Sequence, residues 1–292
     1  MNVAVFFTYN ISLVNWIDLG IYSREMQIYK NISESSEANF TFLTFGDKQD
    51  LLIKDHLFNY EIIPIYNKIK KTKTKSLNFL KTLILPFKLK KDLKNIDLIK
   101  TNQLNGAWSA IILKFLLKKP LIVRTGYDLL SFAIKEKKSF YKRIFYYFLT
   151  QISLIFSDKY LVSSNADKEF LKKYFISTNK IEVSYNWILP GNKYNSGKRY
   201  DSKLLAVGRL EKQKNYHEMI KNFSDSNYQI DIVGEGSQKK ELMDLAKSNN
   251  VKINFLGTLN HPDLINLYKE YKFFLLFSKF EGNPKVLIEA MG

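Results

Sequence analysis

The sequence has no cysteine, which excludes disulfide bonds and metal sites built from thiolates. Its three histidines, His56, His217 and His261, are scattered along the chain, and no Asp-x-Asp triad occurs that would hold a divalent cation. We therefore expect neither a metal site nor a bound cofactor.

A long hydrophobic run is also missing. The longest uncharged stretches, residues 1–17 and 144–157, have 17 and 14 residues, whereas a helix that spans a bilayer needs about 20. The first residues, MNVAVFF, carry no positive charge ahead of the apolar side chains and make a poor signal peptide. These features predict a soluble, cytoplasmic protein.

Acidic residues are scarce beside basic ones, with 28 Asp and Glu against 45 Lys and Arg. Residues 1–200 hold 32 basic against 16 acidic residues, whereas residues 201–292 hold 13 against 12. A basic first half suits anionic lipid headgroups or a phosphate-bearing acceptor. A composition biased toward Lys, Asn, Ile and Tyr explains the surplus but not its confinement to one half. No RNA-binding signature is present, so no nucleic-acid partner is expected.

Short β-branched and aromatic runs alternate with helical spacings of apolar residues along the chain. Strands are expected at residues 2–7, 40–45, 61–65, 97–101, 120–125 and 159–163, and then at 203–207, 228–233, 251–256 and 273–277. This alternation predicts parallel, doubly wound α/β sheets. The stretch PGNKYNSG is typical of a linker, so we expect two Rossmann-like domains, residues 1–195 and 196–292.

Two segments of the first half are candidates for contact with an acceptor or a membrane. Residues 8–20 form a long connection of the kind that faces ligands in open α/β sheets, or else a packed surface loop. Residues 67–95 interleave many Lys with Leu, Phe and Ile and contain a single Asp. They form either a basic amphipathic helix on an anionic membrane surface or an ordinary surface helix broken near Pro86.

Two turns of the first half, residues 101–103 and 124–128, follow neighbouring expected strands and should lie on one sheet edge. Residues 163–165, Ser-Ser-Asn, are typical of a helix N-cap. In the second half, Arg209 and Lys214 follow a strand, and such cations suit a diphosphate. Gly234 and Gly236 follow the next strand, where they allow close approach to the backbone or simply make a tight connection.

The last thirteen residues, FEGNPKVLIEAMG, follow a strand expected to be buried on both faces. Asn283 and Pro284 indicate a helix start, with Pro at the first helical position. Glu289 is surrounded by apolar residues, so its carboxylate should be buried and hydrogen-bonded, either to a ligand or to a core Arg or Lys. Glu281 lies eight positions earlier, and the two carboxylates bracket a helix N-terminus, which favours anions.

The spacing from Glu281 to Glu289, preceded by GRLEKQKN at residues 208–215, resembles the E-x7-E signature of retaining glycosyltransferases of family 4. The resemblance implies a GT-B fold, with two Rossmann-like domains facing a cleft. It implies that Arg209 and Lys214 hold the donor diphosphate, that Glu281 orients the donor sugar and that Glu289 accepts hydrogen bonds from the ribose. Further donor contacts are implied for Gly282, Asn283, Pro284, Lys285, Val286, Gly234, Gly236 and Leu256.

Many members have a His near the positions of Tyr127 and Asp128; this chain has none there, so no catalytic role is assigned to that turn. Members also continue past the strand and helix with which this chain ends, so the second domain is expected to be incomplete and truncated.

The resemblance implies metal-independent transfer of a sugar from a nucleotide diphosphate sugar to a lipid-linked or polysaccharide acceptor in cell-surface glycan synthesis, by a cytoplasmic enzyme peripheral on the inner membrane face. Two alternatives stay open. One is a GT-B-like sugar-nucleotide epimerase, and the other is an inactive relative that binds only nucleotide or a membrane.

Overall fold

The computed structural model describes residues 1–53, 59–188 and 197–292. These residues divide into two compact units, Met1–Tyr185 (unit 1) and Asn186–Gly292 (unit 2). The predicted boundary at residue 195 lies outside the described residues, so the domain limits 1–195 and 196–292 stay a prediction. No helix within the described ranges has the length and apolar character needed to cross a membrane.

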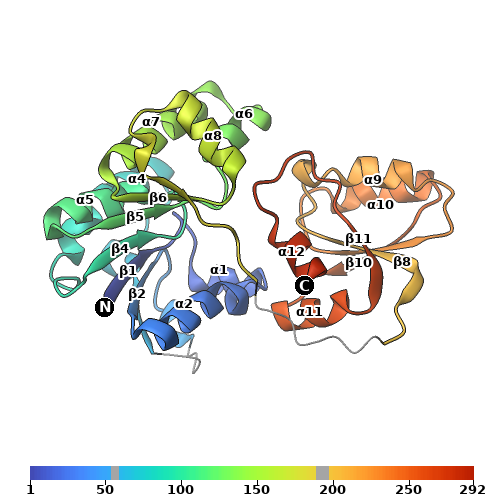
Figure 1. The fold of residues 1–292 in the computed structure, drawn as a ribbon, viewed down its shortest axis with the longest axis horizontal. Coiled ribbons are helices and arrows are strands. Elements are labelled where there is room, and N and C mark those ends of the chain that lie inside the picture. The colour runs from blue at the N-terminus through green and yellow to red at the C-terminus, as the bar shows by residue number, and fades with distance from the viewer. Residues whose placement is uncertain (54–58, 189–196) are drawn as a thin grey trace. The chain divides into compact units, whose positions relative to one another are not determined.

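Unit 1 is built on a seven-stranded parallel sheet in the order β3-β2-β1-β4-β5-β6-β7 (Figure 1). The strands are β1 (Asn2–Phe6), β2 (Asn39–Thr44), β3 (Tyr60–Pro64), β4 (Leu98–Thr101), β5 (Leu121–Arg124), β6 (Lys159–Val162) and β7 (Ile181–Val183). The chain winds outward from β1 first to one side and then to the other, which is the doubly wound topology. Each strand predicted for the first half is present.

Helices cover both faces of this sheet. They are α1 (Leu13–Asp18), α2 (Tyr22–Ser36), α3 (Ile65–Lys68), α4 (Lys75–Leu89), α5 (Ala107–Leu117), α6 (Leu129–Lys135), α7 (Phe140–Phe156) and α8 (Asn165–Tyr174). Val3 and Val5 pack with α1 and α2, whereas Ala4 and Phe6 belong to the core formed with α4, α5 and α7. Because the strand is buried on both faces, its sequence is apolar throughout.

Residues 8–20 are not a plain loop, because they contain α1. The Ser12 hydroxyl caps this helix, and the Asp50 carboxylate accepts hydrogen bonds from the amides of Leu13 and Val14, at 3.3 and 3.2 Å. Trp16 is buried and stacks on Phe7, with ring centroids 4.3 Å apart. The segment is therefore packed into unit 1.

The expected break near Pro86 is also wrong, since α4 continues through this residue to Leu89. Proline cannot donate a hydrogen bond to the carbonyl four residues earlier, which here belongs to Thr82. The Ser109 hydroxyl from α5 donates to that carbonyl instead, at 2.8 Å. A contact from a neighbouring helix thus compensates for the missing backbone bond.

Unit 2 has a four-stranded parallel sheet in the order β10-β9-β8-β11 (Figure 1). The strands are β8 (Tyr200–Val207), β9 (Gln229–Val233), β10 (Lys252–Gly257) and β11 (Tyr271–Leu275). One face packs on α9 (Tyr216–Asn222) and α10 (Lys239–Ser248), and the other on α11 (His261–Tyr268) and α12 (Lys285–Met291). All four predicted strands are present, which confirms the parallel α/β class.

One expectation for unit 2 is corrected. The last strand was predicted to be buried on both faces, but β11 is at the edge of the described sheet and pairs there with β8. Its Phe273 side chain is 50% exposed. The aromatic run indicated the strand correctly, but its apolar character did not determine how many neighbours the strand has.

Candidate active site

The carboxyl ends of the four parallel strands bring the candidate residues of unit 2 to one sheet edge. Arg209 follows β8, Gly234 follows β9, Leu256 lies near the end of β10, and Glu281 lies in the connection from β11 to α12. Strands that are parallel and adjacent place these positions together although they are far apart in the sequence.

Backbone hydrogen bonds join the connections at this edge. The Gly208 amide donates to the Val233 carbonyl at 2.9 Å, and the Leu210 amide donates to the Glu235 carbonyl at 3.0 Å. The Gly234 amide donates to the Gly257 carbonyl at 2.7 Å. The connections after β8, β9 and β10 therefore hold one another in place.

The glycines after β9 are required by this close packing. A Cβ atom at Gly234, where φ is +138°, would lie 2.2 Å from the Gly208 carbonyl oxygen. At Gly236 it would lie 2.5 Å from the Leu210 carbonyl oxygen. The space beside both glycines is filled by the chain's own backbone, and their part in donor binding stays a prediction.

Leu256 has a structural setting of its own. It lies between Phe255 and Gly257, where the register of β10 against β9 shifts, and its side chain packs against the apolar cluster shared with α11. A bulge at a strand end alters the direction of the backbone, so any donor contact made by Leu256 would come from its backbone atoms.

The centre of the candidate site is an ion pair between Lys214 and Glu281. Lys214 Nζ lies 2.6 Å from Glu281 Oε1, and the two side chains are only 14% and 20% exposed. The Lys214 side chain passes close over Gly208, because a Cβ atom at that glycine would be 3.0 Å from Lys214 Cε. Two residues predicted from separate motifs are thus joined in one partly buried contact.

Gln213 fixes the turn that carries Glu281, a role that the sequence analysis missed. Its side-chain amide donates to the Phe280 carbonyl at 3.0 Å, and its own carbonyl accepts from the Lys279 amide at 2.9 Å. The only signal in the sequence was its position beside Lys214 in the GRLEKQKN segment. These two hydrogen bonds join the two connections and position the lysine and the glutamate against each other.

Arg209 differs from Lys214 in its surroundings. Its side chain is exposed, and within the described part of the chain it takes part in no ion pair. A guanidinium group can bind phosphate oxygens through two parallel hydrogen bonds. Arg209 therefore offers a cation to an anionic ligand without first having to give up a carboxylate.

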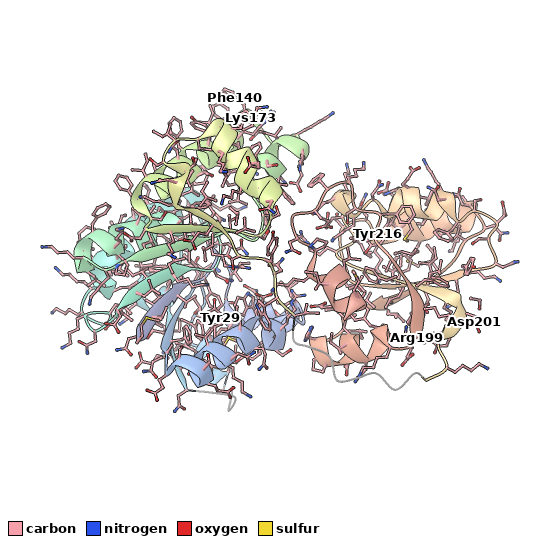
Figure 2. The ribbon with its side chains drawn as sticks, viewed as in Figure 1. Tyr29, Phe140, Lys173, Arg199, Asp201 and Tyr216 are labelled. Carbon is pink, nitrogen blue, oxygen red and sulfur yellow. The ribbon has the colours of Figure 1, made fainter. Side chains whose placement is uncertain are left out.

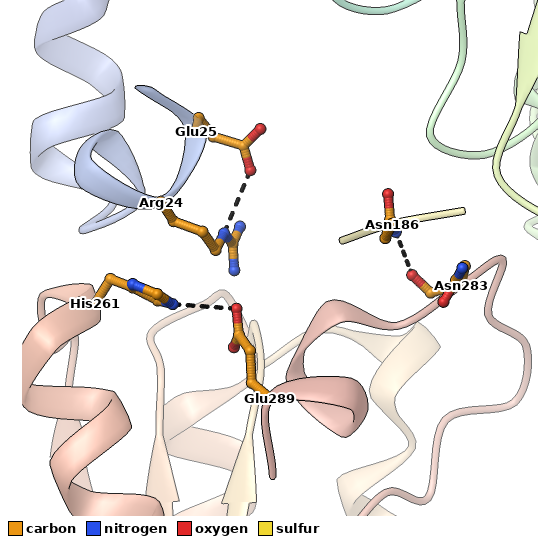
Figure 3. Close-up of polar contacts among 6 residues, drawn as sticks. All are labelled: Arg24, Glu25, Asn186, His261, Asn283 and Glu289. Carbon is orange, nitrogen blue, oxygen red and sulfur yellow. Dashed lines mark hydrogen bonds and ion pairs between the residues drawn. The ribbon is translucent and has the colours of Figure 1, made fainter. Parts of the chain in front are cut away.

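Glu289 is buried, as predicted, with 4% of its surface exposed. Its Oε1 lies 3.3 Å from Nε2 of His261, the first residue of α11 (Figure 3). The sequence offered no sign of this contact, because the two residues are 28 positions apart and belong to different helices. The burial and the hydrogen bond agree with the expectation for this position, but the histidine was not among the expected partners.

The start of α12 differs by one residue from the prediction. The helix begins at Lys285, and Pro284 is the N-cap, whose carbonyl accepts hydrogen bonds from the Leu287 and Ile288 amides. The ψ angle of 108° keeps Pro284 extended, although its φ would also fit a helix. The Asn283 carbonyl accepts a hydrogen bond from the Asn186 side chain (Figure 3).

The remaining donor-binding candidates lie around this helix start. Gly282 and Lys285 are half-buried. The partly buried Val286 side chain packs against the apolar cluster between α11 and the sheet, and the part of these residues in donor binding stays a prediction.

A cavity beside β11 includes Glu289 but neither Glu281 nor Lys214. It is lined by residues of β8, α11, β11 and α12, among them Tyr271, Phe273 and Met291, and by Arg199, which precedes β8. The two glutamates of the predicted signature therefore have different surroundings. Glu281 is paired with Lys214 at the sheet edge, whereas Glu289 is buried beside His261 at the start of α11.

The two turns predicted to share an edge of unit 1 are joined directly. The Gly126 amide donates to the Gln103 side chain at 2.8 Å, and the Ser163 hydroxyl donates to the Gly126 carbonyl at 2.7 Å. Asp128 caps α6 by accepting from the Ser131 amide at 2.6 Å. Burial raises the pKa of the Asp128 carboxyl to about 6. At the next connection, Ser164 caps α8, as the sequence predicted.

Two doubly wound, parallel α/β units that follow one another along the chain are typical of the GT-B class of fold. Solved structures agree. The lipopolysaccharide outer core galactosyltransferase WaaB has a TM-score of 0.65 at 19% identity, over 100% of this chain and 78% of its own. HepE of Anabaena, in complex with UDP and glucose, has 0.68 at 18%, over 100% and 78%. Sucrose-phosphate synthase of Thermosynechococcus elongatus has 0.73 at 13%, over 100% and 79%.

Residues 194–292 match the model of the family described as "Glycosyl transferases group 1". An alpha-1,4-N-acetyl-D-galactosaminyltransferase of Campylobacter jejuni, whose name specifies an undecaprenol-diphosphate-linked glycan, is 27% identical over 63% of this chain and 49% of its own length. The amylovoran biosynthesis glycosyltransferase AmsD of Erwinia amylovora is 31% identical over 46% and 40%. The chain thus matches about half the length of these curated relatives or less. The family assignment made from the sequence is confirmed.

Proposed function

We propose that this chain is a retaining, metal-independent glycosyltransferase that moves a sugar from a nucleotide diphosphate sugar to a lipid-linked or polysaccharide acceptor. The observation that carries the proposal is the Lys214–Glu281 pair beside an exposed Arg209 at the edge of a parallel sheet. In this proposal residues 196–292 bind the donor and residues 1–195 face the acceptor.

The chemistry requires a preorganised positive charge. When the bond from the sugar to the phosphate breaks, negative charge concentrates on the leaving diphosphate. Arg209 and Lys214 supply fixed cations for that charge, and such electrostatic stabilisation is usually the largest contribution to catalysis. One N–H of the Lys214 ammonium faces Glu281, which leaves two donors for phosphate oxygens. Glu281 then lies where it orients the sugar attached to that phosphate, and Glu289 binds the ribose.

The relatives support the nature of both substrates. HepE is described in complex with UDP and glucose, which fits a nucleotide diphosphate sugar as donor. The name of the Campylobacter jejuni relative specifies an undecaprenol-diphosphate-linked glycan, and AmsD is named for amylovoran biosynthesis. In this proposal the acceptor is lipid-linked, and the reaction takes place at the cytoplasmic face of a membrane.

The test compares Arg209→Ala with Lys221→Ala, which removes an exposed cation from α9, away from the candidate site. Calorimetric titration with UDP, GDP and their sugars identifies the donor. Loss of a charge-assisted bidentate contact costs about 1.5–3 kcal/mol, so Arg209→Ala should weaken binding of that nucleotide about 10- to 100-fold. Transfer should fall at least as far, and Lys221→Ala should behave like the native chain.

Unchanged turnover in Arg209→Ala would refute the assignment of Arg209 to the donor diphosphate and, with it, the proposed site. Incubation of the donor without an acceptor separates the epimerase alternative, because only an epimerase converts the donor to an isomer. Nucleotide binding without transfer to any glycan or lipid-linked acceptor would favour the inactive relative.

A further inference from the structure

The outward side of α7 has an unusual composition. A surface helix normally turns its apolar side inward and its polar side to water. In α7 the buried side includes the hydroxyl-bearing Thr150 and Ser153, whereas the outward side is apolar and aromatic along the whole helix. Tyr141 is 83% exposed and Phe148 is 57% exposed. Figure 2 shows Phe140, at the start of this helix, at the outer surface of unit 1.

The apolar surface extends from α7 over α5 to α4. Phe156 of α7 meets Phe115 of α5 with ring centroids 5.3 Å apart, and Phe145 of α7 meets Phe79 of α4 at 6.1 Å. On α4 a second stripe is exposed at spacings of three and four residues, which places it on one side of the helix. We call this surface the α4–α7 face, and its exposed apolar side chains are Leu77, Leu80, Ile84, Phe87, Phe115, Phe140, Tyr141, Ile144, Phe145, Tyr147, Phe148, Ile152, Ile155 and Phe156.

Basic side chains accompany this apolar face. Residues 67–158 hold 20 Lys and Arg against five Asp and Glu. Within this range, the three helices of the face, α4, α5 and α7, carry six Lys and Arg and no Asp or Glu. Several of the few acids are neutralised locally, since Asp92, Glu136 and Asp158 each form an ion pair with a lysine. Only two charged residues, Lys142 and Arg143, lie on α7, and both are near its start.

We propose that the α4–α7 face binds the surface of an anionic lipid bilayer. Exposed aromatic and aliphatic side chains partition into the boundary between headgroups and acyl chains, and surrounding Lys and Arg are attracted to anionic lipids. A second copy of the chain fits this face less well, because association through it would bring two strongly basic surfaces together. Membrane binding would give access to a lipid-linked acceptor, and this purpose rests on the proposed function. The argument from the exposed apolar and basic side chains does not depend on it.

The test is sedimentation of the full chain with vesicles of phosphatidylcholine alone or mixed with phosphatidylglycerol. The double variant Phe148→Ser/Ile152→Ser removes two exposed side chains of α7, and Ile32→Ser removes one that is 38% exposed on α2, which covers the opposite side of the unit 1 sheet. We expect the native chain and Ile32→Ser to bind the phosphatidylglycerol vesicles, and the double variant to bind at least about tenfold more weakly. High salt should release the native chain.

Three results would overturn the proposal. They are no binding of the native chain to phosphatidylglycerol vesicles, undiminished binding by the double variant, and a native dimer in light scattering that the double variant dissociates. Nucleotide titration of the same proteins keeps this test apart from the proposed function. The double variant should bind the nucleotide as the native chain does, and a native chain that binds vesicles but no nucleotide would remove only the proposed function.

Discussion

The Lys214–Glu281 pair makes a quantitative prediction through a double-mutant cycle with Glu281→Gln and Lys214→Met. At 2.6 Å and an effective dielectric constant of about 20, Coulomb attraction is about 6 kcal/mol. Desolvation of two side chains that are 14% and 20% exposed cancels much of it. We expect a coupling energy of about 2 kcal/mol. The double variant should therefore be destabilised by about 2 kcal/mol less than the sum of the two single variants.

Native-state hydrogen exchange of amides in β8 and β9 is the suitable measurement, because it reports the unfolding of unit 2 separately from unit 1. The matched control is the Lys239–Glu235 pair, which has a similar distance of 2.7 Å but side chains that are 38% and 48% exposed. An exposed pair of this kind should give a coupling of only about 0.3–0.5 kcal/mol. Equal coupling in the two pairs would refute the argument that partial burial makes the Lys214–Glu281 contact a fixed element of the site.

The same variants separate structure from donor binding. If Glu281 orients the sugar and Lys214 binds the phosphates, Glu281→Gln removes a negative charge near the diphosphate. Binding of the free nucleotide diphosphate should then be undiminished, while sugar transfer is lost. Lys214→Met should weaken the binding of both the nucleotide and its sugar. Loss of free nucleotide binding in Glu281→Gln would show that its chief role is to hold Lys214.

Two further predictions concern stability. Burial raises the pKa of Asp128 to about 6 from 3.8, so its contribution to stability is present below about pH 4 and is lost as the pH rises through about 6. Asp128→Asn keeps a capping residue but does not titrate. The unfolding free energy of this variant minus that of the native chain should be about 3 kcal/mol larger at pH 7.5 than at pH 4. Denaturant titrations that give the same difference at both pH values would contradict this. Gly234→Ala would place a Cβ atom 2.2 Å from the Gly208 carbonyl oxygen, whereas a Cβ atom at Gly197 meets nothing within 4 Å. Thermal unfolding should show a loss of several kcal/mol in Gly234→Ala, on the order of 3, and almost none in Gly197→Ala.

Periodicity predicted ten of the eleven strands, because strands of a sheet covered on both faces are mostly apolar and are separated by helical patterns. The details that failed depended on contacts between distant segments. α4 continues through Pro86 because Ser109 of another helix satisfies the Thr82 carbonyl, and α1 was missed because its stabilising carboxylate, Asp50, is some 36 residues further along the chain. Local sequence cannot show such partners.

The candidate site divides in the same way. The carboxyl ends of parallel strands lie at one edge of a sheet, so the predicted strands were enough to place Lys214 and Glu281 at the same edge. The partner of Glu289 could not be predicted, since a position within a helix does not specify which neighbouring helix supplies a contact.

The two glutamates of one sequence motif occupy different electrostatic environments. Glu281 shares a partly exposed pair with a lysine, whereas Glu289 is almost fully buried beside His261. A carboxylate so buried is held in one geometry by the packing around it, which suits a residue that fixes the position of a ligand hydroxyl. One that is paired with a cation at the sheet edge is better suited to respond when a diphosphate competes for that cation. In the proposed function, Glu289 accordingly holds the ribose in a fixed position, whereas Glu281 orients the donor sugar from an ion pair that a bound diphosphate can perturb.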